Sequence, residues 1–89
     1  MRLTSKALDD LARLHAFLEP VDPRVAARTV QRLMAGVRVL GENPRIGASI
    51  SGFEPREVRR LIVGNYEMRY EQTEGGAVIL RLWHTREDR

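Results

Sequence analysis

Residues 58–72 read VRRLIVGNYEMRYEQ, and this stretch decides the fold. At its centre stands Gly64-Asn65, a pair that is typical of a two-residue hairpin turn. Residues on both sides of the pair follow a period of two, which indicates β-structure. The stretch therefore predicts a strand over Val58–Val63 and a returning strand over Tyr66–Gln72.

The two faces of the returning strand differ in polarity, because successive side chains point to opposite sides of a sheet. One set should pack against a core: Tyr66, Met68 and Tyr70. The other set should face water, since a lone buried arginine costs too much free energy: Glu67, Arg69 and Glu71. The hairpin thus needs a second layer on one side only.

Downstream of the hairpin, Thr73–Gly76 predicts a second turn, and Ala77–His84 predicts the last strand. That strand is apolar on both sides except at Arg81, which favours a central position in the sheet. At the other end of the chain, Met1–Thr4 alternates and predicts a short opening strand. Residues 43–56 hold two prolines, two glycines and two serines, and they predict a loop.

Two helices are predicted between the opening strand and this loop. Thr4 or Ser5 should cap the first, and apolar residues at three- and four-residue spacing predict one buried stripe: Leu8, Leu11, Leu14, His15 and Leu18. Asp22 followed by Pro23 marks the start of the second. Its stripe comprises Ala26, Val30, Leu33, Met34, Val37 and Leu40, and it should end at Gly41 with Pro44 beyond.

Gly36 lies inside the second predicted helix and should cost about 1 kcal/mol relative to alanine. It is either a neutral imperfection or a point where the two helices approach closely. The whole chain, residues 1–89, is predicted to form one domain in the order β-α-α-β-β-β. This is an α+β fold of two layers, a helical hairpin packed on a mainly antiparallel four-stranded sheet.

Composition excludes several classes of site. The chain has no cysteine and only two histidines, so neither a disulfide framework nor a structural zinc site is expected. No metal and no cofactor are predicted. No apolar run approaches the roughly 18 residues that span a bilayer, and the amino terminus lacks a signal-peptide pattern. We therefore expect a cytoplasmic protein without a membrane partner.

The chain is basic, with 15 Lys and Arg against 12 Asp and Glu and a formal charge of +3. Every basic residue except Lys6 is arginine, which indicates either a compositional bias or selection for bidentate contacts to carboxylate or phosphate. Counted by halves, the signs are nearly balanced. The charge alone is therefore weak evidence for a polyanionic partner.

One surface of the predicted sheet is the best candidate for binding. Arginines and one large aromatic ring should gather on its water-facing side, next to the carboxyl-terminal tail, and such groups can hold phosphate or a large partner. The candidates are Arg59, Arg69, Arg81, Trp83, His84, Arg86 and Arg89, and Ile79 should share this side of the sheet with Arg81 and Trp83. The alternative is an ordinary solvated face and a passive tail. By phase with Leu82, His84 could also turn toward the helices.

Four segments together resemble the RelE/ParE superfamily of bacterial toxins, and the tail is most similar to the ParE-type branch. They are ALDDL at 7–11, NPRIG at 43–47, RRLIVGNYEMRY at 59–70 and ILRLWHTREDR at 79–89. The resemblance covers nearly the whole chain and implies the toxin of a type II toxin–antitoxin module. It implies two alternative targets, since ParE-type members poison DNA gyrase and RelE-type members cut messenger RNA on the ribosome.

The ribonuclease alternative would need a group that moves protons and cations that hold the charge growing on the phosphate. His84 would supply the first, and Arg69, Arg81 and Arg86 the second. Glu67 stands three residues before Tyr70, where RNA-cutting relatives commonly carry an arginine. A charge of +3 is also small for gripping ribosomal RNA. We therefore favour gyrase as the target; a third alternative is a non-toxic interaction module.

The resemblance also implies a cognate antitoxin, a disordered acidic segment that folds as a helix on an apolar groove. Three apolar residues do not fit the buried stripes of their elements and are the candidates for this contact: Phe17, Val21 and Phe53. The alternative is that they form the edge of the core.

Overall fold

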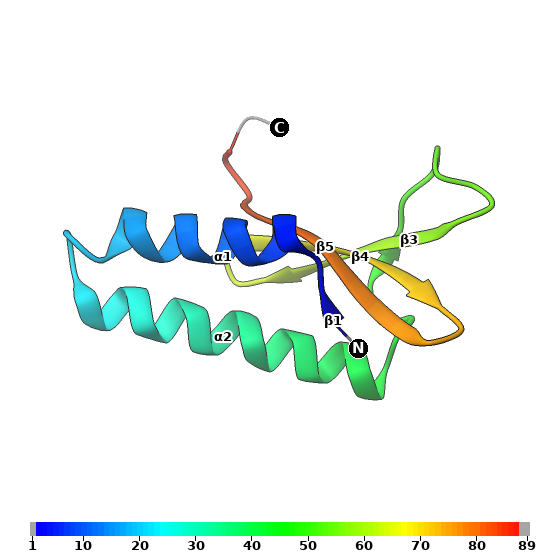
Figure 1. The fold of residues 1–89 in the computed structure, drawn as a ribbon, viewed down its shortest axis with the longest axis horizontal. Helices are drawn as coiled ribbons and strands as arrows, with labels where there is room; N and C mark the ends of the chain where they lie inside the picture. The colour runs from blue at the N-terminus through cyan, green and yellow to red at the C-terminus, as the bar shows by residue number, and fades with distance from the viewer. Residues whose placement is uncertain (1, 88–89) are drawn as a thin grey trace.

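The computed structural model describes residues 2–87 and places two helices on one face of a single sheet (Figure 1). The predicted two-layer α+β fold is confirmed. The sheet has five strands rather than four, because part of the predicted loop forms a two-residue edge strand. The elements are β1 (Arg2–Leu3), α1 (Ser5–Leu18), α2 (Pro23–Glu42), β2 (Ala48–Ser49), β3 (Glu57–Val63), β4 (Tyr66–Thr73) and β5 (Gly76–His84).

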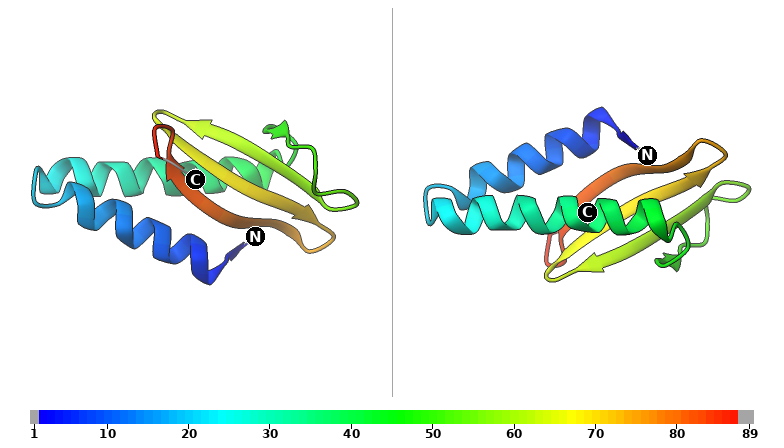
Figure 2. Two further views of the ribbon diagram at one scale, coloured as in Figure 1. Left: turned by 90° about the horizontal axis from the view of Figure 1, so that it is seen from above. Right: turned by 90° about the horizontal axis from the view of Figure 1, so that it is seen from below.

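The strands lie in the order β1-β5-β4-β3-β2. Only β1 and β5 run parallel; the three other pairs are antiparallel. The helical hairpin crosses the sheet and its tip extends beyond the strands (Figure 2). Because β1 pairs with only the first half of β5, through Val78 and Ile79, the second half of β5 has no neighbouring strand on that side.

Both predicted helix starts are confirmed. The Thr4 side chain accepts a hydrogen bond from Ala7 N–H at 3.1 Å, and Asp22 accepts one from Arg24 N–H at 2.9 Å. These bonds satisfy backbone donors that a first helical turn leaves without an intrahelical acceptor. The second helix ends one residue later than predicted, at Glu42.

The core lies between the helices and the sheet, and the predicted stripe of α2 faces it. In α1 the predicted stripe is wrong at two positions, since Leu8 is 53% exposed and the His15 side chain is 39% exposed. The buried side of α1 is centred instead on Ala7, Asp10 and Leu14. Asp10 is buried on this side because its carboxylate accepts hydrogen bonds from Arg81 and from Leu82 N–H at the edge of β5.

Gly36 marks a close approach, but to the sheet rather than to the other helix. A Cβ at this position would lie 3.0 Å from Val63 Cγ2 and 3.5 Å from the terminal methyl of Met68. The missing side chain therefore lets α2 settle onto β3 and β4.

A β-bulge interrupts β5. Arg69 is opposite Arg81, whereas the next residue of β4, Tyr70, is opposite Ile79, so Leu80 is the extra residue. The bulge shifts the alternation by one, and Ile79 and Leu82 both enter the core. The prediction that Ile79 shares the water-facing side with Trp83 is therefore wrong.

Candidate functional site

The sheet face turned away from the helices carries a row of stacked rings and cations, which we call the outer sheet face. Two guanidinium groups lie over the Trp83 ring, with Arg69 Cζ at 4.8 Å and Arg81 Cζ at 5.0 Å from its centroid. Arg69 also lies 6.0 Å from the ring of Phe53, in the loop before β3. Such contacts attract a cation to the face of an aromatic ring.

The outer sheet face is closed rather than open, contrary to the prediction. Trp83 is only 7% exposed, and Glu67, which lies directly opposite it, is 1% exposed. The cause is that Arg69 and Arg81 lie against the ring, and Arg69 also reaches Glu67 Oε2 at 3.4 Å. The arginines therefore cover the tryptophan and the glutamate instead of projecting into water.

Arg81 is held at the sheet edge by Asp10 of α1. Its Nε and Nη2 donate to the two carboxylate oxygens at 2.7 and 3.1 Å, and Leu82 N–H donates to the same carboxylate at 2.9 Å. Burial raises the pKa of Asp10, but these bonds and the charge of Arg81 outweigh burial, and the pKa lies below its usual 3.8. Asp10 thus supplies a hydrogen-bond acceptor to the half of β5 that has no neighbouring strand on this side.

Arg59 does not join the outer sheet face. It pairs with Tyr70 in the register, so it shares the helix side of the sheet. There it donates to the Gly47 carbonyl at 2.8 Å and to Glu57 at 3.0 Å. The arginine of β3 that stands opposite Arg69 is the exposed Arg60.

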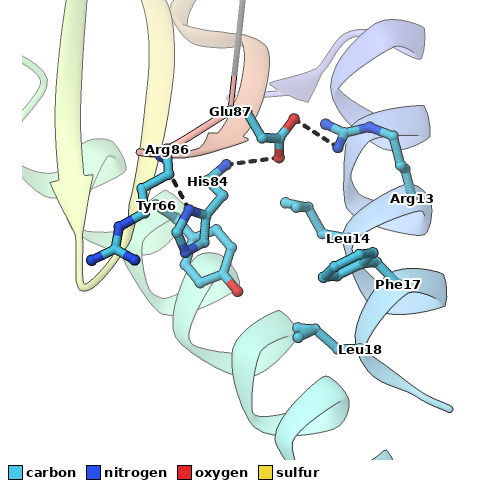
Figure 3. A pocket seen from close by; sticks show the side chains of 8 residues that line it. All are labelled: Arg13, Leu14, Phe17, Leu18, Tyr66, His84, Arg86 and Glu87. Atoms are coloured by element: carbon cyan, nitrogen blue, oxygen red, sulfur yellow. Dashed lines mark hydrogen bonds and ion pairs between the residues drawn. The ribbon is translucent and has the colours of Figure 1, made fainter. Parts of the chain in front are cut away.

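His84 lies on the helix side of the sheet, in a groove of about 560 Å³ between α1 and the end of β5 (Figure 3). Its ring meets Tyr66 edge to face, with centroids 5.2 Å apart. The floor and far wall are apolar, and charged side chains stand at the rim. The lining residues are Arg13, Leu14, Phe17, Leu18, Tyr66, His84, Arg86 and Glu87.

The first residues after β5 are tied down and form one side of this groove. Glu87 accepts bonds from His84 N–H at 3.0 Å and from Arg13 Nη1 at 2.8 Å, and Arg86 N–H donates to His84 Nδ1 at 3.1 Å. A neutral His84 ring would therefore carry its proton on Nε2. Burial raises the pKa of Glu87, but the bonds from His84 N–H and Arg13 and the charge of Arg13 lower it more, to below its usual 4.5.

The four residues named for ribonuclease chemistry do not meet. Arg81 and Trp83 point to the outer sheet face, whereas the next strand positions, Leu82 and His84, point to the helix side. Arg86 stays with His84, and Arg69 and Arg81 are engaged on the other face. Arg89, the last candidate for target binding, lies outside the described residues.

The candidates for antitoxin binding also separate. Phe17 lines the groove and is 77% exposed, and Val21 follows it in the hairpin loop at 85% exposed. Phe53 lies on the other side of the sheet, against Arg69. Two of the three candidates therefore lie together, at the groove and the adjoining tip of the hairpin.

Asp10 holds Arg81 at the outer sheet face, and Arg13 and Glu87 pair at the groove, but the sequence-based prediction of binding residues included none of the three. Asp10 had a detectable signal, because it stands three residues after Ala7 and four before Leu14, inside the buried stripe of α1. Arg13 and Glu87 are 74 positions apart, and no local pattern connects them. Among residues 2–87, no group of three His, Asp or Glu side chains is arranged to hold a metal ion, and no helix is long and apolar enough to cross a membrane.

Fold and site together define a small two-layer α+β protein with an apolar groove that has charged side chains at its rim. The model of one family, the ParE toxin of type II toxin-antitoxin system, parDE, matches residues 1–89. The chain belongs to this family.

A solved structure described as a chromosomal ParDE TA system from P. aeruginosa has the same fold. A chain in it is similar to this one with a TM-score of 0.75 at 23% identity, over 93% of this chain and 91% of that one. No curated protein matches the sequence.

Proposed function

We propose that this toxin arrests growth by binding and poisoning DNA gyrase and that a cognate antitoxin neutralises it. Membership of the ParE toxin family supports the choice of target. The observation that carries the choice of mechanism is that His84 lies on the opposite side of the sheet from Arg69 and Arg81. A protein that acts by binding does not need these groups together.

RNA cleavage would need them at one phosphate. The attacking 2′-hydroxyl must lose a proton while cations hold the charge that builds up a few ångströms away. Here Arg81 is held by Asp10, Arg69 reaches Glu67, and at the groove Arg13 is paired with Glu87 at 2.8 Å. The groove is apolar inside, which suits an apolar side chain better than a phosphodiester.

The surface proposed for gyrase is the tail together with the end of β5. His84 and Arg86 stand at the rim of the groove, and Arg89 follows them in the sequence. Arg81 and Trp83 contribute indirectly, since they fix the strand from which the tail leaves. Arg59 and Arg69 are engaged elsewhere, and we expect them to contribute least to gyrase binding.

The groove is the proposed seat of the antitoxin. A helix that presents apolar residues at i, i+3, i+4 and i+7 would fill a groove of this kind. Phe17 and Val21 would be the first contacts, because both are exposed beside it. Arg86 at the rim would suit an acidic segment.

Purified toxin tests both parts of the proposal in two parallel assays. In the first, gyrase supercoils relaxed plasmid with increasing toxin; in the second, ribosomes translate a defined messenger whose ends are mapped. We expect inhibition in the first assay and intact messenger in the second. Because His84 would be a contact rather than an acid or base, His84→Ala should cost about 5- to 30-fold in gyrase inhibition.

A ribonuclease would give the opposite pattern. Cleaved messenger, together with a loss of about 10²–10⁴-fold in cleavage rate for His84→Ala, would show proton transfer and overturn the proposal. Arg59→Ala is the matched control, since the same kind of truncation at a residue outside the proposed contact should leave gyrase inhibition within twofold.

A further inference from the structure

The outer side of α2 carries a row of arginines, which we call the α2 arginine row: Arg24, Arg28, Arg32 and Arg38. All four are exposed. Between Pro23 and Gly41 the helix contains no acidic residue. The core-facing residues of α2, among them Leu33 and Leu40, lie on the opposite side of the helix.

These arginines have no acidic partner among the described residues, and they are the only group of such arginines that shares one helix within residues 2–87. Elsewhere in the described chain, ion pairs with acids engage six arginines: Arg13, Arg45, Arg56, Arg59, Arg69 and Arg81. None of the four in the α2 arginine row makes an ion pair or a side-chain hydrogen bond to any residue within 2–87. Their guanidinium groups are thus free to bind an anion.

The spacing makes the row regular. Arg24, Arg28 and Arg32 follow one another at i, i+4 and i+8, so their side chains lie one above the next on neighbouring turns. At 1.5 Å per residue, Arg38 lies about 21 Å along the helix from Arg24. Like charges at i, i+4 destabilise an isolated helix, and a polyanion bound along the row would remove this repulsion.

The row fits a phosphate backbone better than a protein surface. A protein interface needs a buried anchor, most often Trp, Tyr or Arg in a pocket. Here the neighbours of the arginines are the short or polar Ala27, Gln31 and Ala35 together with Val25 and Val39, which are 39% and 38% exposed, and none of them is such an anchor. Duplex DNA presents charges repeated along its length, and arginine binds phosphate in a bidentate manner.

We propose that the α2 arginine row is a docking surface for duplex DNA. The choice of DNA as the polyanion rests on the proposed function, because gyrase works on duplex DNA and a toxin bound to it would lie beside that duplex. Contacts would be to phosphates, so binding should be independent of sequence and strongly dependent on salt.

Fluorescence anisotropy of a labelled 20-base-pair duplex, titrated with the purified toxin at several salt concentrations, tests this without gyrase. The variant Arg24→Gln/Arg28→Gln/Arg32→Gln removes three of the proposed contacts. We expect its affinity to fall at least tenfold at low salt. The slope of log K against log salt should become shallower by about 2 to 3, since each phosphate contact contributes about 0.9.

The control Arg2→Gln/Lys6→Gln/Arg60→Gln removes the same charge from exposed positions outside α2. It should lower the affinity less than threefold and change the slope by less than one. Far-ultraviolet circular dichroism would establish that both variants are folded. Equal losses of affinity in the two variants would mean that DNA binding depends only on net charge, and this would overturn the proposal.

Three other outcomes would also contradict it: no binding of the duplex at 50 mM salt, binding of an RNA hairpin but not of DNA, or a loss confined to the binding of an acidic protein partner. Failure here is separable from failure of the proposed function. Gyrase inhibition without DNA binding would leave gyrase as the target and remove the DNA surface. DNA binding without gyrase inhibition would leave the DNA surface and remove gyrase as the target.

Discussion

At the scale of single residues, Asp10 links two elements of the fold through one side chain. Its carboxylate joins α1 to β5 by accepting two bonds from Arg81 and one from Leu82 N–H. Because Arg81 also lies against Trp83, the same carboxylate indirectly fixes the outer sheet face. A buried acid in the middle of a helix therefore satisfies a backbone donor at the edge of the sheet.

Replacing this acid should destabilise the fold. In Asp10→Ala the Leu82 N–H loses its acceptor and Arg81 loses its counter-charge. A broken buried pair costs about 3–5 kcal/mol, but Arg81 is 37% exposed and water screens part of this. We expect about 2–3 kcal/mol less free energy of unfolding, measured by urea denaturation. Asp9→Ala, at the exposed neighbouring position, should change it by less than 0.5 kcal/mol.

The same carboxylate should make stability depend on pH. The pKa of Asp10 is lowered in the folded state, so its contribution is present above the unfolded pKa of about 4 and is lost as pH falls through the folded value. The pKa values of Glu57, Glu71 and Glu87 are also lowered and act in the same direction.

We therefore expect the free energy of unfolding to fall steadily from about pH 5 to pH 2. In Asp10→Asn the fall should be shallower than in the wild type, because one of the carboxylates with a lowered pKa is missing. Urea denaturation at each pH measures both curves. Parallel curves for the two proteins would mean that Asp10 is not held ionised by its partners.

At the scale of elements, local chemistry predicted most of the order of helices and strands. Thr4 and Asp22 cap the helices as expected, and the Gly64-Asn65 turn joins β3 to β4. These signals are short in range and are carried by two to four residues each. Long-range pairing produces the features that were missed.

Leu80 is the clearest case. A bulge depends on how β5 registers against β4, and the sequence of β5 alone is compatible with regular alternation. The consequence is that Ile79 lies on the helix side of the sheet rather than on the predicted water-facing side. The edge strand β2 was missed for a similar reason, since its two residues are a strand only through their pairing with Arg59 and Arg60.

The tail is an element in its own right, and its removal should separate structure from function. Deleting residues 85–89 removes the bonds of Glu87 to Arg13 and to His84 N–H. Because these bonds lie near the surface, we expect a cooperative urea transition with a loss of about 1 kcal/mol. Gyrase inhibition should fall by at least tenfold. If inhibition is undiminished, the tail is not part of the target surface.

At the scale of the whole molecule, 89 residues leave a thin margin of stability. The exposed groove and hairpin tip are apolar surface that the free toxin does not bury. The site was predictable only in part at this scale, since the sequence identified His84 and Phe17 but not the groove they share. That groove is assembled from α1, β4, β5 and the tail, which only the tertiary fold brings together.

Binding of the antitoxin should therefore stabilise the toxin by mass action. At a free concentration one hundred times the dissociation constant, the gain is about 2.7 kcal/mol. For a domain of this size, we expect the melting temperature of the toxin to rise by roughly 10 °C or more, measured by calorimetry of the complex and of each part. Phe17→Ala should reduce the rise without lowering the stability of the free toxin, because its side chain is exposed. Equal melting temperatures with and without antitoxin would contradict the proposed groove.

The central proposal is that this protein stops growth by holding gyrase rather than by cutting RNA. Pulse-labelling of DNA and protein synthesis in one bacterial culture, after induction of the toxin without antitoxin, tests it most directly. We expect the incorporation of thymidine to fail first while the incorporation of methionine continues. If protein synthesis collapses first, translation is the target, and the assignment of His84 as a contact is wrong.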